Sequence, residues 1–176
     1  MLQRYSEVLN LPVICADSGK KAGVIRDILF SAEERQVKAL LLEREGISVK
    51  KRVVFLSELI SLGGDAAIVN SDGCVSEMDR ASFRNSFKDE GSLIGLRVFS
   101  KAGGEVGVVR DVIFDWRTGR IEGFEISDGL LQDVMHGRML LPLFGKVELG
   151  KEFAVVEQEA VDEMEGTGGG IKGRLQ

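Results

Sequence analysis

The chain of 176 residues contains one pattern twice, and this duplication limits the folds open to it more than any other feature. Residues 23–30 read GVIRDILF, and residues 107–114 read GVVRDVIF. The three positions that differ exchange one aliphatic residue for another. A repeat distance of about 85 residues is too long for a solenoid unit and suits a small domain. We therefore expect two small domains built to one plan.

The match extends on both sides of this octapeptide. Upstream, residues 11–14 correspond to residues 96–99, with a polar, Gly-containing turn before the octapeptide in each copy. Downstream, three more segments correspond in order: 36–42 with 120–126, 52–56 with 138–142, and 67–69 with 154–156. These segments are short, rich in Val, Ile, Leu and Phe, and separated by Gly, Asp and Ser, which is typical of β-strands. Short strands with tight turns predict a small barrel or sandwich.

The predicted fold class is all-β, with two small β-barrels in tandem. We expect a first barrel over residues 1–75, a short helical connector over 76–91, a second barrel over 92–165 and a flexible Gly-rich tail over 166–176. The connector is predicted because Ser76 to Asp79 resemble a helix cap in front of residues 80–88. A short acidic helix is expected within residues 157–165, and Gly166 is expected to end the ordered structure.

Charge and cysteine content exclude several classes of function. The net charge is −5, and residues 1–90 and 91–176 each contain more acidic than basic side chains. Strong direct binding to nucleic acid requires an excess of Lys and Arg, so it is not expected. No apolar run is long enough for a transmembrane helix, and the N-terminus lacks the apolar core of a secretory signal. Both cysteines, Cys15 and Cys74, fall in the first copy, which argues against a structural disulfide and predicts a cytoplasmic location.

The most informative polar residues are the Arg-Asp pairs of the two octapeptides. Adjacent strand residues point to opposite faces, so one member of each pair should lean into the barrel unless a bulge intervenes. A buried Asp needs hydrogen bonds, typically from backbone N–H groups. Recurrence in both copies favours a structural role, and binding of a partner by one of the Arg residues is the alternative.

Each of the other candidate residues has both a structural and a functional interpretation. The basic run at residues 50–52 is either a solvated strand end or a contact for RNA or another anionic partner. Trp116, in a predicted hairpin turn, either forms an exposed contact or caps the barrel end. His136, the only histidine, has no partner base or nucleophile nearby in the sequence. Cys15 is expected to be buried, and Cys74 to lie in a turn, where a redox role is the alternative to a structural one.

No catalytic, cofactor or metal site is predicted, because one His and two Cys make no ordinary zinc site without carboxylates. The residues proposed for partner binding are Arg26, Arg110, Trp116, Lys50, Lys51 and Arg52.

The pattern resembles the PRC-barrel family, named for the cytoplasmic domain of the photosynthetic reaction centre H subunit. The residues that carry the resemblance are Val13, Gly19 and 23–30 in the first copy, and Val98, Gly104, 107–114 and Pro142 in the second. The first copy departs from the pattern with Leu56 at the position of Pro142. The resemblance implies a small all-β barrel that serves as a docking surface for other macromolecules. It carries no catalytic residues.

The expected function is therefore a non-enzymatic protein-interaction module in the cytoplasm, with no cofactor. One alternative is an RNA-processing or ribosome-assembly accessory factor, because the resemblance extends to the C-terminal domain of a ribosome maturation factor. The acidic balance disfavours that alternative. Another is a small ligand-binding barrel, which is disfavoured because barrels of this size are usually filled by their own side chains. The sequence leaves self-association open.

Overall fold

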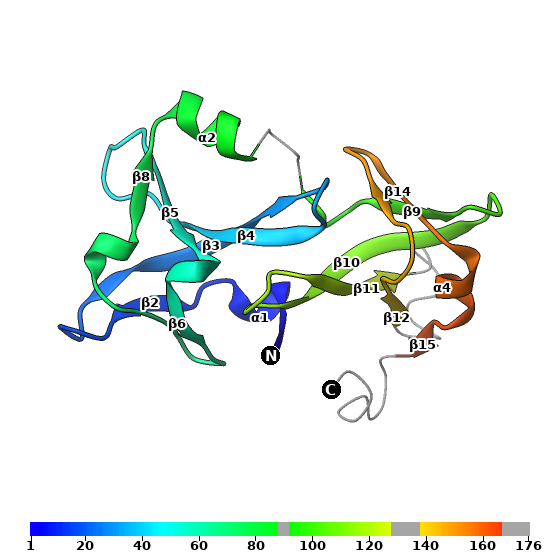
Figure 1. Cartoon of the computed structure of the whole chain (residues 1–176), viewed down its shortest axis with the longest axis horizontal. Helices are drawn as coiled ribbons and strands as arrows, with labels where there is room; N and C mark the ends of the chain where they lie inside the picture. Colours follow the sequence, from blue (N-terminus) through cyan, green and yellow to red (C-terminus); the bar gives the residue numbers. More distant parts are fainter. Residues whose placement is uncertain (88–91, 128–137, 167–176) are drawn as a thin grey trace. The chain divides into compact units, whose positions relative to one another are not determined.

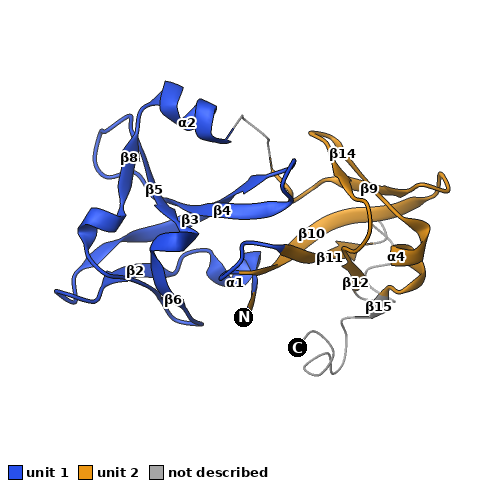
Figure 2. Ribbon diagram, viewed as in Figure 1, with its two compact units in different colours: residues 1, 3–90, 116–120 blue, residues 2, 91–115, 121–176 orange. Residues whose placement is uncertain are grey.

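A computed structural model describes residues 1–87, 92–127 and 138–166. The chain divides into two units, which Figure 2 shows in different colours. Unit 1 comprises residues 1, 3–90 and 116–120, and unit 2 comprises residues 2, 91–115 and 121–176. Both units consist mainly of β-strands, which confirms the predicted fold class.

The strands of unit 1 follow the order β6-β7-β2-β3-β4-β5-β8 (Figure 1). Neighbours are antiparallel except β2 and β7, which are parallel. The strands are β2 (Pro12–Cys15), β3 (Lys21–Ser31), β4 (Gln36–Leu42), β5 (Lys51–Phe55), β6 (Leu59–Leu62), β7 (Ala67–Val69) and β8 (Ser76–Met78). The N-terminal strand β1 (Leu2–Arg4) precedes helix α1 (Tyr5–Val8). Two 3-10 turns, η1 (Leu56–Glu58) and η2 (Asp72–Cys74), and helix α2 (Arg80–Phe87) complete the unit.

Unit 2 repeats this topology strand for strand, with the order β13-β14-β9-β10-β11-β12-β15. Its parallel pair, β9 with β14, is the counterpart of β2 with β7. The strands are β9 (Arg97–Ser100), β10 (Glu105–Asp115), β11 (Ile121–Ser127), β12 (Met139–Pro142), β13 (Glu148–Leu149), β14 (Phe153–Val156) and β15 (Glu165–Gly166), with helix α4 (Gln158–Asp162) before β15. The sequence duplication is therefore a duplication of fold.

The long strands of the two units carry β-bulges at equivalent positions. The register of β3 against β4 shifts between Ile25 and Asp27, and that of β10 against β11 shifts between Val109 and Asp111. In each Arg-Asp pair the arginine is therefore the extra residue of the bulge, and the aspartate follows it. Two further shifts recur at equivalent places in each unit. Bulges bend and twist a strand, and here they curl each sheet towards a half-barrel.

Each sheet buries one face around an aliphatic and aromatic core. The largest fully buried side chains of unit 1 include Ile25, Leu40 and Leu42, and those of unit 2 include Phe114, Phe124, Ile126 and Leu141. Inward and outward positions alternate along β2, where Val13 and Cys15 are buried and their neighbours are not. This alternation leaves one set of side chains on the outer face of each sheet.

The prediction of a helical connector over residues 76–91 is wrong for its first three residues. Residues 76–78 form strand β8, which pairs with β5, and α2 begins only at Arg80. Asp79 caps this helix: its carboxylate accepts a hydrogen bond from the Ser82 N–H at 2.7 Å, which lowers the pKa of Asp79. Phe87 then packs with Ala39 and Val53 in the core of unit 1. Of the predicted cap, Ser76 to Asp79, only Asp79 caps the helix, and residues 76–78 belong to the sheet. Residues 88–91 lie outside the described part.

At the C-terminus the predicted acidic helix is present as α4, shorter than expected. The prediction that order ends at Gly166 is wrong, because β15 pairs Glu165 with Leu140 and Gly166 with Met139. Residues 167–176, the rest of the predicted tail, lie outside the described part.

Candidate interaction surfaces

Both arginines of the repeated Arg-Asp pairs lie exposed on the outer side of their bulges. Arg110 donates a hydrogen bond from Nε to the Ser127 hydroxyl at 2.7 Å, so it stabilises the hairpin of its own unit. In unit 1 the residue equivalent to Ser127 is Glu43, because Ile25 pairs with Leu42 as Val109 pairs with Ile126. The structure leaves both guanidinium groups accessible from outside.

The aspartates of these pairs have a structural role. Asp27 Oδ1 accepts the Ile28 N–H at 2.8 Å, and Asp111 Oδ1 accepts the Val112 N–H at 2.9 Å. A bulge interrupts the ladder of backbone hydrogen bonds, and each carboxylate provides an acceptor beside that interruption. Asp111 is buried, whereas Asp27 is half-buried and also accepts the Tyr5 hydroxyl at 3.0 Å.

The basic run at the start of β5 is largely occupied by contacts within unit 1. Arg52 Nη2 donates to the Ala22 carbonyl at 2.6 Å, and its Nε lies 3.6 Å from Glu45 Oε2. Lys50 Nζ lies 3.9 Å from Glu77 Oε2, and Lys51 Nζ lies 5.7 Å from the centre of the Phe83 ring. Arg52 is thus a structural anchor, and the two lysines remain at the surface.

Of the two readings of Trp116, the structure favours burial. Its side chain is only 6% exposed, and within the described part of the chain its indole N–H has no hydrogen-bond acceptor. The Arg117 guanidinium lies 5.5 Å from the ring centre. Among the other aromatics of the second copy, Phe124 is fully buried and Phe144 is partly exposed.

The two thiols differ in accessibility, and His136 lies outside the described residues. Both cysteines are free; Cys15 is buried at the end of β2, and Cys74 is half-exposed in η2. Burial, together with the nearby carboxylates of Asp17 and Asp72, raises the pKa of the Cys15 thiol. The thiolate is the reactive form, so Cys15 is chemically protected.

We expect Cys74 to react with an aromatic disulfide reagent at mildly alkaline pH at least about tenfold faster than Cys15, because Cys15 needs local opening and carries a raised pKa. The measurement is the rate of thiol release, with peptide mapping to assign each site. A Cys74→Ser variant should retain only the slow phase. Modification of Cys15 first would contradict the structure.

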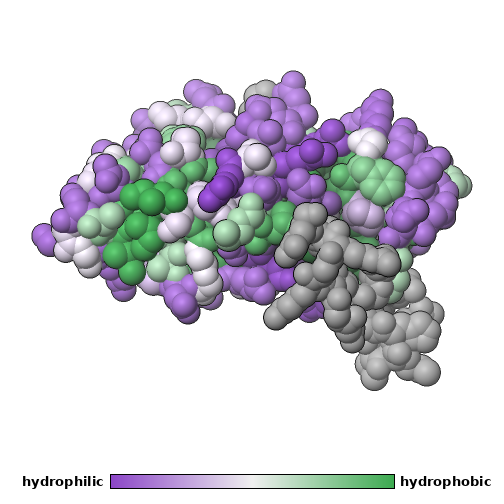
Figure 3. Space-filling view, turned by 60° about the horizontal axis from the view of Figure 1, so that its bottom comes forward, coloured by the Kyte–Doolittle hydropathy of each residue, from purple (hydrophilic) through white to green (hydrophobic). Residues whose placement is uncertain are grey.

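The outer face of the β2–β7 pair in unit 1 is apolar. Ile14 of β2 stands directly opposite Ile68 of β7, and both are half-buried. Ile60, in the bulge of the neighbouring edge strand β6, is 55% exposed. Figure 3 shows hydrophobic side chains gathered over the end of unit 1 that carries β2 and β6. We call Ile14, Ile60 and Ile68 the outer face of unit 1.

The equivalent strands of unit 2 carry an apolar outer face as well. Phe99 of β9 stands opposite Val155 of β14, and Phe153, which is 44% exposed, contacts Phe99 edge-on with ring centres 5.7 Å apart. The Arg97 guanidinium lies 5.4 Å from the Phe99 ring centre and 5.8 Å from that of Phe153, and its Nε donates to Glu105 Oε1 at 2.9 Å. We call Phe99, Phe153 and Val155 the outer face of unit 2.

Sequence reasoning missed both outer faces. Alternation in β2 and β9 places residues 14 and 99 outside, and both are large and apolar where a solvated face normally carries polar residues. Comparing the outward positions of the two copies, rather than only their matching core positions, would have shown this.

A family model for the PRC-barrel domain matches the chain twice, over residues 2–73 and 91–161. The chain belongs to the PRC-barrel family. The two matches follow the sequence repeat and confirm the tandem arrangement of PRC-barrel domains. A comparison with curated proteins finds no match.

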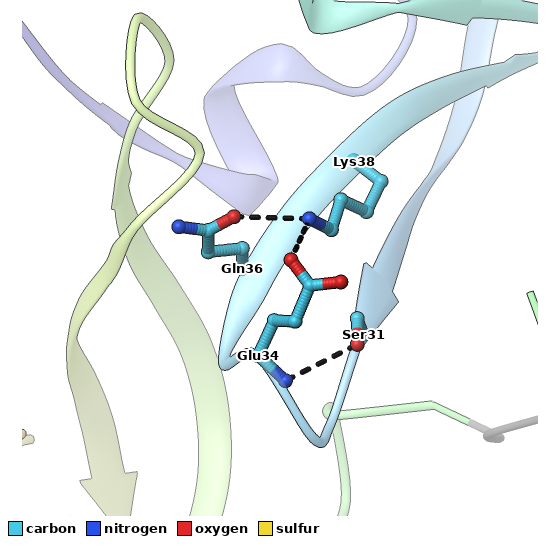
Figure 4. Close-up of polar contacts among 4 residues, drawn as sticks. All are labelled: Ser31, Glu34, Gln36 and Lys38. Atoms are coloured by element: carbon cyan, nitrogen blue, oxygen red, sulfur yellow. Dashed lines mark hydrogen bonds and ion pairs between the residues drawn. The ribbon is translucent and has the colours of Figure 1, made fainter.

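Unit 1 has a pocket of about 480 Å³ beside the turn between β3 and β4. Phe30, Phe55 and Phe87 contribute to its apolar wall. At its polar side, shown in Figure 4, Lys38 Nζ contacts the Glu34 carboxylate and lies 3.0 Å from Gln36 Oε1, and the Glu34 N–H donates to Ser31 Oγ. The ammonium and the carboxylate neutralise each other within the hairpin, so this pair leaves no net charge to select an ionic ligand.

Over residues 1–87, 92–127 and 138–166, no three His, Cys, Asp or Glu residues lie together as metal ligands. Within the same residues, no helix has the length and apolar character needed to cross a membrane.

Proposed function

We propose that this tandem PRC-barrel protein is a non-enzymatic interaction protein whose two domains bind a protein partner through their outer faces. The observation that carries the proposal is the repetition: the same outward positions of the same parallel strand pair are apolar in both units. A sheet with one face on the core usually presents polar residues on the other. Apolar side chains kept outside in both copies therefore favour a contact surface.

The outer face of unit 2 has the composition of an interface centre. Aromatic residues and Arg are enriched there, whereas Lys, Glu and Asp are depleted. Phe99 and Phe153 provide rigid aromatic surface, and Arg97 lies within cation–π distance of both rings. The Arg97–Glu105 pair provides a polar rim beside them.

The family supports the same proposal, because PRC-barrel domains are known protein-interaction modules. In this proposal the protein acts in the cytoplasm, since two free thiols suit a reducing compartment. The acidic net charge disfavours nucleic acid as the principal partner.

The test is site-specific photo-crosslinking in cells, with the crosslinking amino acid placed at Ile60 or Phe153. The matched control is Ala81, which is exposed on α2 and belongs to neither outer face. We expect a discrete crosslinked protein at Ile60 and Phe153 and none at Ala81. Binding of the identified partner should weaken about tenfold or more in Ile60→Lys or Phe153→Lys, as for central interface residues.

A crosslink to a second copy of this chain would identify the partner as itself. The proposal fails if no discrete product forms at either outer-face position, or if Ala81 gives the same product with equal yield.

A further inference from the structure

The loop between β4 and β5 projects two aliphatic side chains into solvent. Ile47 is fully exposed and Val49 is 82% exposed, which makes them the two most exposed large hydrophobic residues in the described part of the chain. Gly46 begins the tip of this loop with a φ of 60°. An isolated exposed aliphatic residue is ordinary, whereas two at one loop tip form a small exposed apolar patch.

Basic residues follow this tip in the chain and occur on the neighbouring helix. Lys50 and Lys51 follow it directly, and β5 pairs with β8, which leads into α2 with its exposed Arg80 and Arg84. The Lys51 ammonium lies over the ring of Phe83 on α2, which ties the end of the loop to the helix. Figure 1 shows the loop between β4 and β5 on the same side of unit 1 as β8 and α2. We call residues 43–51 together with Arg80 and Arg84 the basic tip.

Most acidic residues in and next to the basic tip already contact a basic side chain or cap a helix. Glu45 lies near Arg52 and Glu77 near Lys50, while Asp79 caps α2. Glu43 is exposed. Among the described residues, Arg44, Arg80 and Arg84 have no ion-pair partner, so the basic tip presents an excess of positive charge on a protein of negative net charge.

We propose that the basic tip docks on an anionic lipid surface. Ile47 and Val49 enter the boundary between headgroups and acyl chains, and Lys50, Lys51, Arg80 and Arg84 contact the headgroups. Apolar insertion and attraction to anionic lipids act together in peripheral binding, and the aliphatic stems of Lys and Arg allow their charges to stay at the interface.

The geometry favours a lipid surface over RNA or a protein. A loop tip whose apolar side chains are almost fully exposed can insert into a lipid bilayer, whereas protein hot spots occupy closely packed pockets. Binding of single-stranded RNA depends on accessible aromatic rings, but Phe83 is half-buried beneath Lys51. The proposal is independent of the outer faces, because it uses a different set of residues.

The test is co-sedimentation of the full chain with vesicles of phosphatidylcholine alone, or of equal parts phosphatidylcholine and phosphatidylglycerol, at low salt. We expect binding only to the anionic vesicles and a decrease as salt is added. Ile47→Ser combined with Val49→Ser should weaken this binding at least about tenfold, because both side chains lose their apolar burial. Arg80→Gln and Arg84→Gln should each weaken it about fivefold.

The matched control is Ile60→Ser, another exposed isoleucine of unit 1, which should leave vesicle binding unchanged. Replacing Ile47 by Trp adds a direct readout, since its emission should shift to shorter wavelength on anionic vesicles. The proposal is overturned if the wild-type chain stays in the supernatant, if the double variant binds as well as wild type, or if RNA binds through Arg80 and Arg84 while vesicles do not. Outer-face variants that lose the protein partner but keep vesicle binding separate the two proposals.

Discussion

Replacing Gly107 by Ala is expected to lower the free energy of unfolding by about 2–5 kcal/mol, through backbone strain and a steric clash. Gly107 has a φ of +147°, which L side chains rarely adopt. An added Cβ would lie 2.4 Å from the Ser127 carbonyl oxygen and 2.5 Å from Ile126 Cγ2. The oxygen belongs to the backbone of the paired strand β11, so the β10–β11 hairpin itself would have to move. Urea unfolding and amide exchange of peptides from β10 measure the effect.

Gly23→Ala is the matched control, because Gly23 opens the same octapeptide in the other copy. Its φ lies outside the strained range, and an added Cβ meets Leu42 Cδ1 at 2.9 Å and Arg52 Nη1 at 3.2 Å. Both are ends of flexible side chains, so the expected loss is about 1 kcal/mol. Equal losses in the two variants would contradict the different backbone conformations of Gly107 and Gly23. They would show that the repeated glycines have one common role.

Asp111→Ala is expected to cost about 2–3 kcal/mol, because it leaves a buried backbone N–H without its acceptor. Asp111 is 2% exposed, and its Oδ1 accepts the Val112 N–H at 2.9 Å beside the bulge. Water has little access to replace this bond. Thermal and urea unfolding measure the loss, and exchange of the Val112 amide should become faster.

Two comparisons make this prediction specific. Asp111→Asn keeps a side-chain oxygen acceptor and should restore most of the stability. Asp27→Ala should cost less than Asp111→Ala, because Asp27 is half-buried and water can hydrate the Ile28 N–H that it leaves. If Asp111→Asn were as unstable as Asp111→Ala, hydrogen bonding to Val112 would not explain the repeated aspartate.

The sequence predicted the fold well because the two copies agree at their core positions. The segment GVIRDILF and its counterpart lie within the long strands β3 and β10, and the residues from 36 to 42 form β4 with the predicted bounds. The arginine of each Arg-Asp pair is exposed and the aspartate lies further inward, as alternation predicts, and a bulge is present at each pair as well. The bulge could not be placed from the sequence, since it depends on the register between two strands.

Local signals misplaced the region after the first barrel. Asp79 does cap a helix, but nothing local shows that Ser76 to Met78 pair with β5, a segment more than 20 residues away. Contacts of this kind are set by tertiary structure and override short sequence patterns.

The candidate site was harder to predict than the fold. Charged residues such as Arg52 and the aromatic Trp116 stand out in a sequence, yet the structure uses Arg52 as an internal anchor and buries Trp116. The outer faces consist of Ile, Val and Phe, which in a sequence look like core. Only the pairing of β2 with β7 and of β9 with β14 shows which of these side chains point outwards.

The parallel pairs have a consequence for biosynthesis. The first long hairpin of each unit can form as soon as it leaves the ribosome, but β2 must wait for β7, and β9 for β14, before its second edge is covered. Closing each barrel is thus a non-local and slow step, during which an uncovered strand edge is available to the wrong partner. Because β7 precedes β9 in the chain, vectorial synthesis supplies β2 with its own partner strand before the equivalent strand of the second copy is available.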